Sequence, residues 1–319
     1  VDSTLYEYYQ RCQEYLLEPV VLNMSDTLFR MAGERQDERM QAVAIATQLD
    51  YYYFQGTNED SVIHYTNKVK EFAKATHQPK YYYFAWANRL ITYYLKTSRT
   101  NIALYEVQNM LKEAQEEDDK TGLSRCYNIM SQIYTIKRFD SMAFEWRLKE
   151  IELTEKYKIE NYNISQTYAQ IANYYINQKK QKEALAAVEK AIATANSSTQ
   201  QISAKLEFVN YYSKFGDFQA AEKLLKECQA AFEQDKRLES IKKRLYNIEC
   251  LYYQQTKQYQ KALEAAKMQE KEERRLSESI LSSIHYRTQG EIYQKMGNMN
   301  LAVKYLQMYI NTDDSLKIA

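Results

Sequence analysis

Apolar residues recur along the chain with the spacing of one face of an α-helix, in paired segments of roughly 16–20 residues. The clearest pair lies near the end of the chain, where a segment that closes with Ile292 and Tyr293 is followed by a short turn and a second segment. The apolar residues of this second segment fall at i, i+1, i+4, i+5 and i+8: Leu301, Ala302, Tyr305, Leu306 and Tyr309. This period is that of an amphipathic helix, so each pair predicts two helices joined by a turn.

The pairs repeat with a period near 40 residues, and two linked columns mark the repeat. The first column is a tyrosine: Tyr53, Tyr94, Tyr134, Tyr175, Tyr212, Tyr253 and Tyr293. Nine residues after each stands a small or β-branched apolar residue: Val62, Ala103, Ala143, Ala184, Ala221, Ala262 and Ala302. The abundance of tyrosine in this chain does not explain the linked second column, because both columns keep one offset throughout. We therefore interpret them as an internal repeat.

Each repeat is predicted to be a helical hairpin that stacks on its neighbours. In the turn Phe215-Gly216-Asp217-Phe218, the glycine is suited to the left-handed conformation that ends a helix, and the aspartate is suited to cap the next one. One hairpin cannot cover both of its apolar faces, so stacking into a solenoid is expected. The alanines allow helices to approach closely, and the tyrosine rings fill the space between hairpins.

Composition and charge narrow the fold and the partners. Glycine and proline number 6 and 2 in 319 residues, too few for the turns of a sandwich, a barrel or a Rossmann unit, which leaves an all-α chain. The 43 basic and 42 acidic residues nearly cancel, so we expect no nucleic-acid partner. No apolar run of 18 residues is present, so any contact with a membrane is expected only through a segment outside this chain.

The repeat resembles the tetratricopeptide repeat (TPR). The resemblance rests on Gly290-Glu291-Ile292-Tyr293, Gly297-Asn298-Met299, Ala302 and Leu306, with similar matches at Ala172–Val188 and Cys250–Ala266. It implies a right-handed α-solenoid of about seven hairpins, a single continuous domain over 37–319, after an N-terminal helical cap at 1–36. The chain departs from the motif by lacking its tryptophan and terminal proline and by its longer period. HEAT repeats share that period but not the tyrosine-to-alanine offset, and the curvature of the solenoid stays open.

A narrower resemblance is to the periplasmic TPR sensor regions of Bacteroidetes membrane-bound histidine kinases and regulators. It rests on Ser25–Phe29, Tyr51–Phe54, Tyr81–Phe84 and the ending Tyr309–Leu316. In that family the repeats precede a membrane helix and then a histidine kinase or a DNA-binding domain. The resemblance implies a periplasmic location and an anchor in the full-length protein, and it leaves the ligand and the output domain open.

Catalytic, metal and cofactor motifs are missing from the sequence. There is no glycine-rich phosphate loop, no G-x-S-x-G elbow, no H-E-x-x-H and no C-x-x-C pair, so we expect no enzymatic activity, no cofactor and no metal. The four cysteines stand far apart, at positions 12, 126, 228 and 250. Cys228 and Cys250 fall on consecutive helices and could approach one another, but both occupy core-facing positions and are expected to be buried and reduced.

A binding surface is expected along the first helix of each hairpin, which lines the concave face of a TPR solenoid. Positions two and six before the repeat tyrosines carry a row of amides, which offer both donors and acceptors to an extended peptide. With the nearby arginines, suited to a carboxylate or phosphate, the candidate ligand-binding residues are Asn88, Arg125, Asn128, Gln132, Asn173, Asn210, Arg244, Asn247 and Arg287. The alternative is that these amides lie on exposed helical faces and bond only to water.

Most repeat tyrosines are expected to be structural, because a ring between hairpins buries a large area. The clusters Tyr51–Phe54 and Tyr81–Trp86 exceed what one buried face accommodates, which favours an interface with the amino-terminal helices or with a second subunit in a homodimer. The sequence as a whole predicts a peptide- or protein-binding module, the extracytoplasmic sensing region of a membrane signalling protein. The alternatives are a cytoplasmic regulator resembling the peptide-responsive Rap proteins and a structural assembly scaffold.

Overall fold

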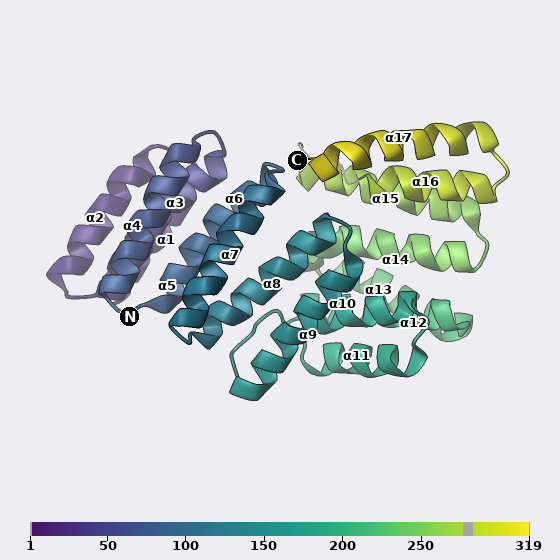
Figure 1. The fold of residues 1–319 in the computed structure, drawn as a ribbon, viewed down its shortest axis with the longest axis horizontal. Coiled ribbons are helices and arrows are strands. Elements are labelled where there is room, and N and C mark those ends of the chain that lie inside the picture. Colours follow the sequence, from purple (N-terminus) through teal and green to yellow (C-terminus); the bar gives the residue numbers. More distant parts are fainter. Residues whose placement is uncertain (1, 277–282, 319) are drawn as a thin grey trace. The chain divides into compact units, whose positions relative to one another are not determined.

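The computed structural model describes residues 2–276 and 283–318, and every regular element in these residues is a helix (Figure 1). The expected all-α fold is confirmed: successive helices are joined by short turns and pair into hairpins that stack on one another as in a solenoid. The chain divides into two compact units, Val1–Ile133 and Tyr134–Ala319, which are described separately. The predicted boundary after residue 36 stays a prediction.

Unit 1 begins with a helical pair that packs on the first repeat hairpin. Its helices are α1 (Ser3–Glu14), α2 (Val20–Glu34), α3 (Glu38–Gln55), α4 (Glu59–Ala75), α5 (Pro79–Tyr83), η1 (Phe84–Ile91), α6 (Thr92–Lys96), α7 (Thr100–Glu116) and α8 (Lys120–Ile136), the last of which ends just beyond the unit. In the core of the first three helices, Leu5, Leu28 and Met40 bring together side chains of α1, α2 and α3.

The helix over residues 79–96, which is the first helix of the second repeat, is not a uniform α-helix. Residues Phe84–Ile91 form a π-helix, η1, between α5 and α6. Just past its end, the Thr92 hydroxyl donates to the carbonyl of Ala87, five residues earlier, at 3.0 Å. The apolar pattern of the sequence predicts a helix here but not this wider winding, which is rare and often marks a functional position.

Unit 2 continues the hairpins, and each of its cores joins consecutive repeats. Its helices are α9 (Asp140–Tyr157), α10 (Ile164–Asn177), α11 (Gln181–Ala193), α12 (Ser198–Phe215), α13 (Phe218–Gln234), the short η2 (Lys236–Ile241), α14 (Lys242–Gln255), α15 (Tyr259–Leu276), α16 (Ile284–Lys295) and α17 (Met299–Ile318). Helix α12 contacts both α10 and α14, so the first helices of these hairpins lie side by side. We call α10, α12 and α14 the inner helices of unit 2.

The second repeat column is buried throughout the chain. Val62 and the six alanines at 103, 143, 184, 221, 262 and 302 are between 0% and 3% exposed. The tyrosine column is less uniform, because Tyr53, Tyr94 and Tyr293 are buried while Tyr134, Tyr175, Tyr212 and Tyr253 are partly exposed. Small side chains at these positions leave no room for solvent between the helices of a hairpin, whereas a tyrosine keeps its hydroxyl near the edge.

The turns within the hairpins share one backbone geometry. The residue four positions after the repeat tyrosine has a positive φ in six repeats: Ser98, Arg138, Lys179, Gly216, Lys257 and Gly297. The next amide donates to the tyrosine carbonyl, as from Asp217 to Tyr212 at 2.9 Å, which is the bond that closes a helix end of the Schellman type. As expected, Gly216 is left-handed at φ 91° and Asp217 caps α13 through the amide of Ala220.

The cysteines lie in the core. All four cysteines are buried with free thiols, which confirms the expectation for Cys228 and Cys250. Burial raises the pKa of each thiol, to about 11 for Cys228 and for Cys250, so neither is a reactive thiolate at neutral pH.

Within residues 2–276 and 283–318, no helix combines the length and the apolar character that a membrane crossing requires.

Candidate peptide-binding site

A pocket of about 390 Å³ opens along the inner helices of unit 2, and we call it the unit 2 pocket. Its walls carry mainly amide, hydroxyl and cationic side chains from α10, α12, η2, α14 and α15. They are Ser165, Gln166, Ala169, Thr199, Gln200, Ser203, Ala204, Ser240, Ile241, Lys243, Arg244, Asn247 and Gln269. This volume lies within the range of sites that hold small ligands or a few residues of a peptide. The predicted residues Arg244 and Asn247 therefore line one cavity.

A buried carboxylate beside this pocket organises three of the predicted residues. Glu207 of α12 is 2% exposed, and its Oε1 accepts from the amide of Asn210 at 2.7 Å and of Asn173 at 3.3 Å. Its Oε2 accepts from Nη2 of Arg244 at 2.9 Å, across the α12–α14 contact. A buried carboxylate is stable only when charge and hydrogen bonds compensate it, and these three side chains supply both.

The same contacts decide which predicted residues remain available to a ligand. Asn210 is only 6% exposed and donates to Glu207, so it supports the wall of the site and does not present its amide to a ligand. Asn247 makes no hydrogen bond with its side chain among the described residues, and it faces the pocket. Gln166 and Ser203 are likewise without a side-chain partner in the described part of the chain. These unpartnered donors and acceptors converge on one cavity.

Arg244 is only partly satisfied. Its Nη2 is bound to Glu207, while its Nε is buried and has no acceptor in the part of the chain that the structure describes. A guanidinium offers five donors in a fixed plane, so the group retains capacity for an acceptor in the pocket. Nε itself is shielded from solvent, so Nη1 is the donor that an arriving carbonyl or carboxylate oxygen would meet beside the amide of Asn247.

The second cation of the pocket, Lys243, is held by an acidic partner. Its ammonium lies 2.8 Å from Oε2 of Glu273 on α15, and the buried His285 of α16 contacts the same carboxylate. Burial alone would raise the pKa of Glu273, but the hydrogen bonds from His285 and Lys243 outweigh it and hold the pKa at about 2. Glu273 therefore stays ionised at neutral pH and ties three consecutive helices together.

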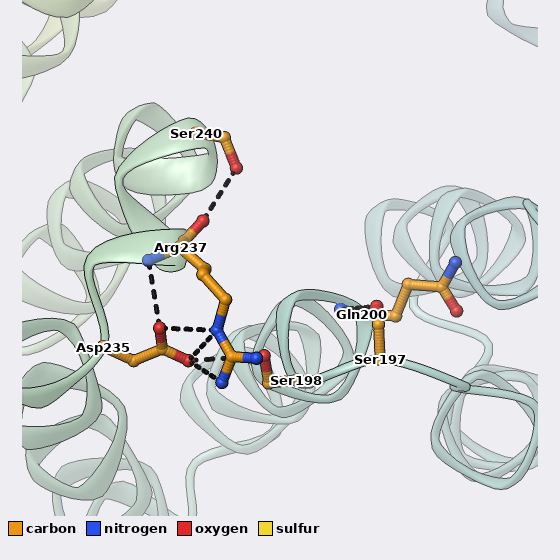
Figure 2. Close-up of polar contacts among 6 residues, drawn as sticks. All are labelled: Ser197, Ser198, Gln200, Asp235, Arg237 and Ser240. Carbon is orange, nitrogen blue, oxygen red and sulfur yellow. Dashed lines mark hydrogen bonds and ion pairs between the residues drawn. The ribbon is translucent and has the colours of Figure 1, made fainter. Parts of the chain in front are cut away.

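The rim of the unit 2 pocket is set by the turn into η2, shown in Figure 2. Asp235 accepts from the backbone amide of Arg237 at 3.0 Å and from its guanidinium at 2.8 Å, and Ser198 donates to the same carboxylate at 3.3 Å. The hydrogen bonds from Arg237 lower the pKa of Asp235 to about 2. These contacts fix the start of α12, and with it Gln200, against the segment that carries Ser240 on the opposite rim.

The remaining predicted residues pair elsewhere. In unit 1, Nη1 of Arg125 donates to Asn88 at 3.1 Å, and Gln132 donates to Asn128 at 2.6 Å. Arg287 of α16 bonds to Glu291 on its own helix, at 2.8 Å. The nine candidate residues thus form separate local groups, and within unit 2 only Arg244 and Asn247 among them line the pocket.

Several residues of the site were not singled out in the sequence. Glu207 stands in the apolar run Leu206–Val209, and its partner Arg244 follows 37 residues later, about one repeat length. Asp50 and Arg89 form a similar pair at a separation of 39 residues. In the sequence, opposite charges separated by about one repeat length were therefore the signal that could have identified these ion pairs. Gln166, Ser203 and Lys243 carry no pattern that distinguishes them from other exposed polar residues.

The arrangement offers hydrogen bonds and charge. Among the described residues, no three His, Cys, Asp or Glu side chains converge as a metal site would require. Glu207 is sequestered behind its donors, and Lys243 is bound to Glu273. The amide and hydroxyl side chains of the pocket wall, such as Asn247 and Ser203, are suited to hold the amides and carbonyls of a bound chain.

Comparison with known proteins supports the fold. No protein-family model and no curated protein matches the sequence. Among solved structures, NprR in complex with its cognate peptide NprX has a TM-score of 0.57 at 13% identity, over 86% of this chain and 81% of that one. A Rap protein complexed with competence and sporulation factor has a TM-score of 0.56 at 11% identity, over 98% of both chains.

A TPR protein from Parabacteroides merdae is also similar, with a TM-score of 0.47 at 12% identity over 98% of both chains. The stacked hairpins, the buried alanine column and the likeness to Rap and NprR together define the class of this chain: a TPR-type α-solenoid.

Proposed function

We propose that this chain is a regulatory module that binds a peptide in the unit 2 pocket. The observation that carries the proposal is the convergence of Asn247, Gln166, Ser203 and the free donors of Arg244 on one cavity between inner helices. Asn247 and Ser203 are half-buried, and such polar groups are costly when they have no partner. A peptide backbone supplies both acceptors and donors to satisfy them. NprR, which has a similar fold, is seen in complex with its cognate peptide NprX, and this supports the same kind of ligand here.

The mechanism we propose is a coupling of ligand binding to the spacing of inner helices. The pocket is bounded by α10, α12 and α14, and Glu207 and Arg244 link the last two. A ligand that bonds to Arg244 competes with or reinforces this link, and the change passes to the next hairpin because each hairpin contacts its neighbours. The carboxy-terminal helices of unit 2 would then shift relative to α12.

Two cellular settings fit this proposal. In the first, the chain is the periplasmic sensing region of a membrane-anchored two-component protein, as the resemblance of its tyrosine-rich segments implies. In the second, it is a cytoplasmic peptide-responsive regulator of the Rap type, and the support for this setting is the likeness of the fold to Rap and NprR. The residues encoded before Val1 and after Ala319 distinguish them: a signal sequence and an apolar segment of about 20 residues support the first, and a helix-turn-helix supports the second.

The binding proposal is tested by native mass spectrometry of the 319-residue chain with an equimolar library of random hexapeptides. We expect selected peptides to remain bound, and the double variant Asn247→Ala with Gln166→Ala to bind them about tenfold more weakly. Neither residue makes a side-chain hydrogen bond within the described residues, so the variant should fold as the wild type does. Asn67→Ala, an exposed amide on α4, is the matched control.

Two results contradict the proposal. One is that the double variant retains the same peptides with unchanged affinity. The other is that no hexapeptide of the library is retained by the wild-type chain, which would favour an assembly scaffold without a peptide ligand. Circular dichroism of the variants separates a loss of binding from a loss of folding.

A further inference from the structure

A second cavity, of about 370 Å³, lies entirely within unit 1, and we call it the unit 1 pocket. It is bounded by α1, α3, α5, η1 and the first turns of α8. Four aromatic rings form much of its wall: Tyr6, Tyr9, Tyr81 and Phe84. The rings of Tyr6 and Tyr9 lie 6.3 Å apart at a tilt of 45°, and Tyr6 is 50% exposed at the mouth. A cavity of this size accommodates an aromatic group with a few further atoms.

The cations of the unit 1 pocket lack acidic partners. Arg39, Lys80 and Arg125 all line it, and none of them forms an ion pair with a described residue. Arg39 instead donates to the phenol of Tyr81 at 3.4 Å. The one acidic residue in the wall, Asp50, is bound to Arg89 outside this lining set, so its charge is already compensated. The cavity therefore has an excess of positive charge against an aromatic wall.

Arg125 is the most constrained of these cations. Its Nη1 donates to Oδ1 of Asn88, and no other acceptor is in reach among the described residues. Burial lowers the pKa of its guanidinium, with no carboxylate nearby to oppose the shift. An arginine that is largely removed from water without a counter-ion is unfavourable, and a carboxylate placed in the plane of its free nitrogens would relieve that cost.

The backbone that holds Arg125 is also unusual. Asn88, its partner, lies in the π-helix η1, whose first residue is Phe84 of the aromatic wall. The π-helix turn is wider than an α-helix turn, so it changes which side chains of this segment share a face. Such turns are uncommon and are frequent at functional sites. The pocket and the irregular helix therefore meet at Phe84, which belongs to both.

We propose that the unit 1 pocket binds a carboxylate that is attached to an aromatic group. The guanidinium of Arg125, with Lys80 at the mouth, holds the carboxylate, and the rings of Tyr9, Tyr81 and Phe84 contact the aromatic group. This chemistry occurs in a free aromatic acid and in the carboxy-terminal residue of a peptide that ends in phenylalanine or tyrosine. The site is separate from the unit 2 pocket and does not depend on the peptide proposed there.

The test is isothermal titration calorimetry of the full chain with N-acetyl-phenylalanine and with its carboxamide. We expect the acid to bind and the neutral amide to bind at least about tenfold more weakly, because only the acid pairs with the guanidinium. The peptide Ala-Ala-Ala-Phe, with a free and with an amidated terminus, distinguishes the two sources. Binding of the free-terminus peptide as tightly as the acid identifies a peptide end, and binding of the acid alone identifies a small molecule.

Variants locate the site. Arg125→Gln should weaken binding of the acid about tenfold or more. Arg30→Gln, the same change at an exposed arginine of α2 that does not line the pocket, should leave binding unchanged. If circular dichroism shows that Arg125→Gln does not fold, Lys80→Gln takes its place, because Lys80 is exposed and makes no ion pair with a described residue. For Lys80→Gln we expect about a threefold loss. Equal binding of acid and amide, or unchanged binding by a folded Arg125→Gln variant, overturns the proposal.

Discussion

The two pockets are built on the same kind of scaffold, helices from consecutive repeats, yet they place charge in opposite ways. In the unit 2 pocket both cations have acidic partners, Arg244 with Glu207 and Lys243 with Glu273, and the free groups are amides and hydroxyls. In the unit 1 pocket the cations are without acidic partners among the described residues, and the wall is aromatic. A repeat scaffold therefore does not fix the chemistry of its pockets. The local neutralisation of charge differs between the two, which is why we propose a peptide for one pocket and a carboxylate for the other.

The largest expected effect concerns the carboxylates beside the pockets. Glu207→Ala should lower the free energy of unfolding by about 4 kcal/mol, because it leaves Arg244 and two amides without their buried acceptor. Asp50→Ala should cost about 2 kcal/mol, since Asp50 is more exposed and its one ion-pair partner among the described residues is Arg89. Urea denaturation followed by circular dichroism measures both. An equal or larger cost for Asp50→Ala would contradict the contrast between the pockets.

Acid should act on unit 2 through Glu273. The pKa of this carboxyl is about 2 in the folded chain against 4.5 when unperturbed, so its stabilising effect is complete above about pH 4.5 and is lost as the pH falls towards 2. The loss should amount to at most about 3 kcal/mol, and Glu273→Gln should flatten the dependence of stability on pH in this range. Urea midpoints measured from pH 5 to pH 2 test this.

The control for the acid experiment is Glu222→Gln. Glu222 is exposed and paired with Lys226 on the same helix, at 2.8 Å, so its removal should leave the pH dependence nearly unchanged. If both variants flatten the curve alike, the network of Glu273, Lys243 and His285 does not have the role assigned to it.

A smaller effect is expected from adding a methyl group where α8 packs closely on Tyr83 of unit 1. A Cβ on Gly122 of α8 would overlap the ring of Tyr83, which is 1% exposed, so Gly122→Ala should destabilise the chain by about 2 kcal/mol. Gly216→Ala in unit 2 meets no atom within 4 Å and should cost about 1 kcal/mol, through its positive φ alone. Thermal unfolding ranks the two, and the reverse order would refute the close contact of α8 with Tyr83.

The smallest expected effect separates support from ligand contact within the unit 2 pocket. Asn210→Ala removes a donor to Glu207 and should cost about 1 kcal/mol. Asn247→Ala should change stability by less than about 0.5 kcal/mol, since its amide has no partner among the described residues. A stability loss for Asn247→Ala as large as that for Asn210→Ala would mean that Asn247 is structural as well.

Much of the fold was predictable because it depends on contacts that are local in sequence. The helical period, the tyrosine-to-alanine offset and the cap at Asp217 each involve residues of a single hairpin, close together in the sequence. The site was predicted only in part: Arg244 and Asn247 line the unit 2 pocket, but Asn210 is buried and Arg287 bonds within its own helix. The winding of η1 was not predicted, because its apolar pattern is compatible with either kind of helix.

The sequence alone determined that this chain is a stack of helical hairpins, since periodicity and turn chemistry act over a few residues. Tertiary structure decided which polar side chains are hydrogen-bonded within the protein and which remain available to a ligand. Glu207 meets Arg244, and Asn88 meets Arg125, across 37 residues in each case, and only the stacking of consecutive repeats brings such groups within hydrogen-bonding distance. Whether an arginine is neutralised or left to a ligand depends on that distance, and so the chemistry of each pocket is a property of the packing.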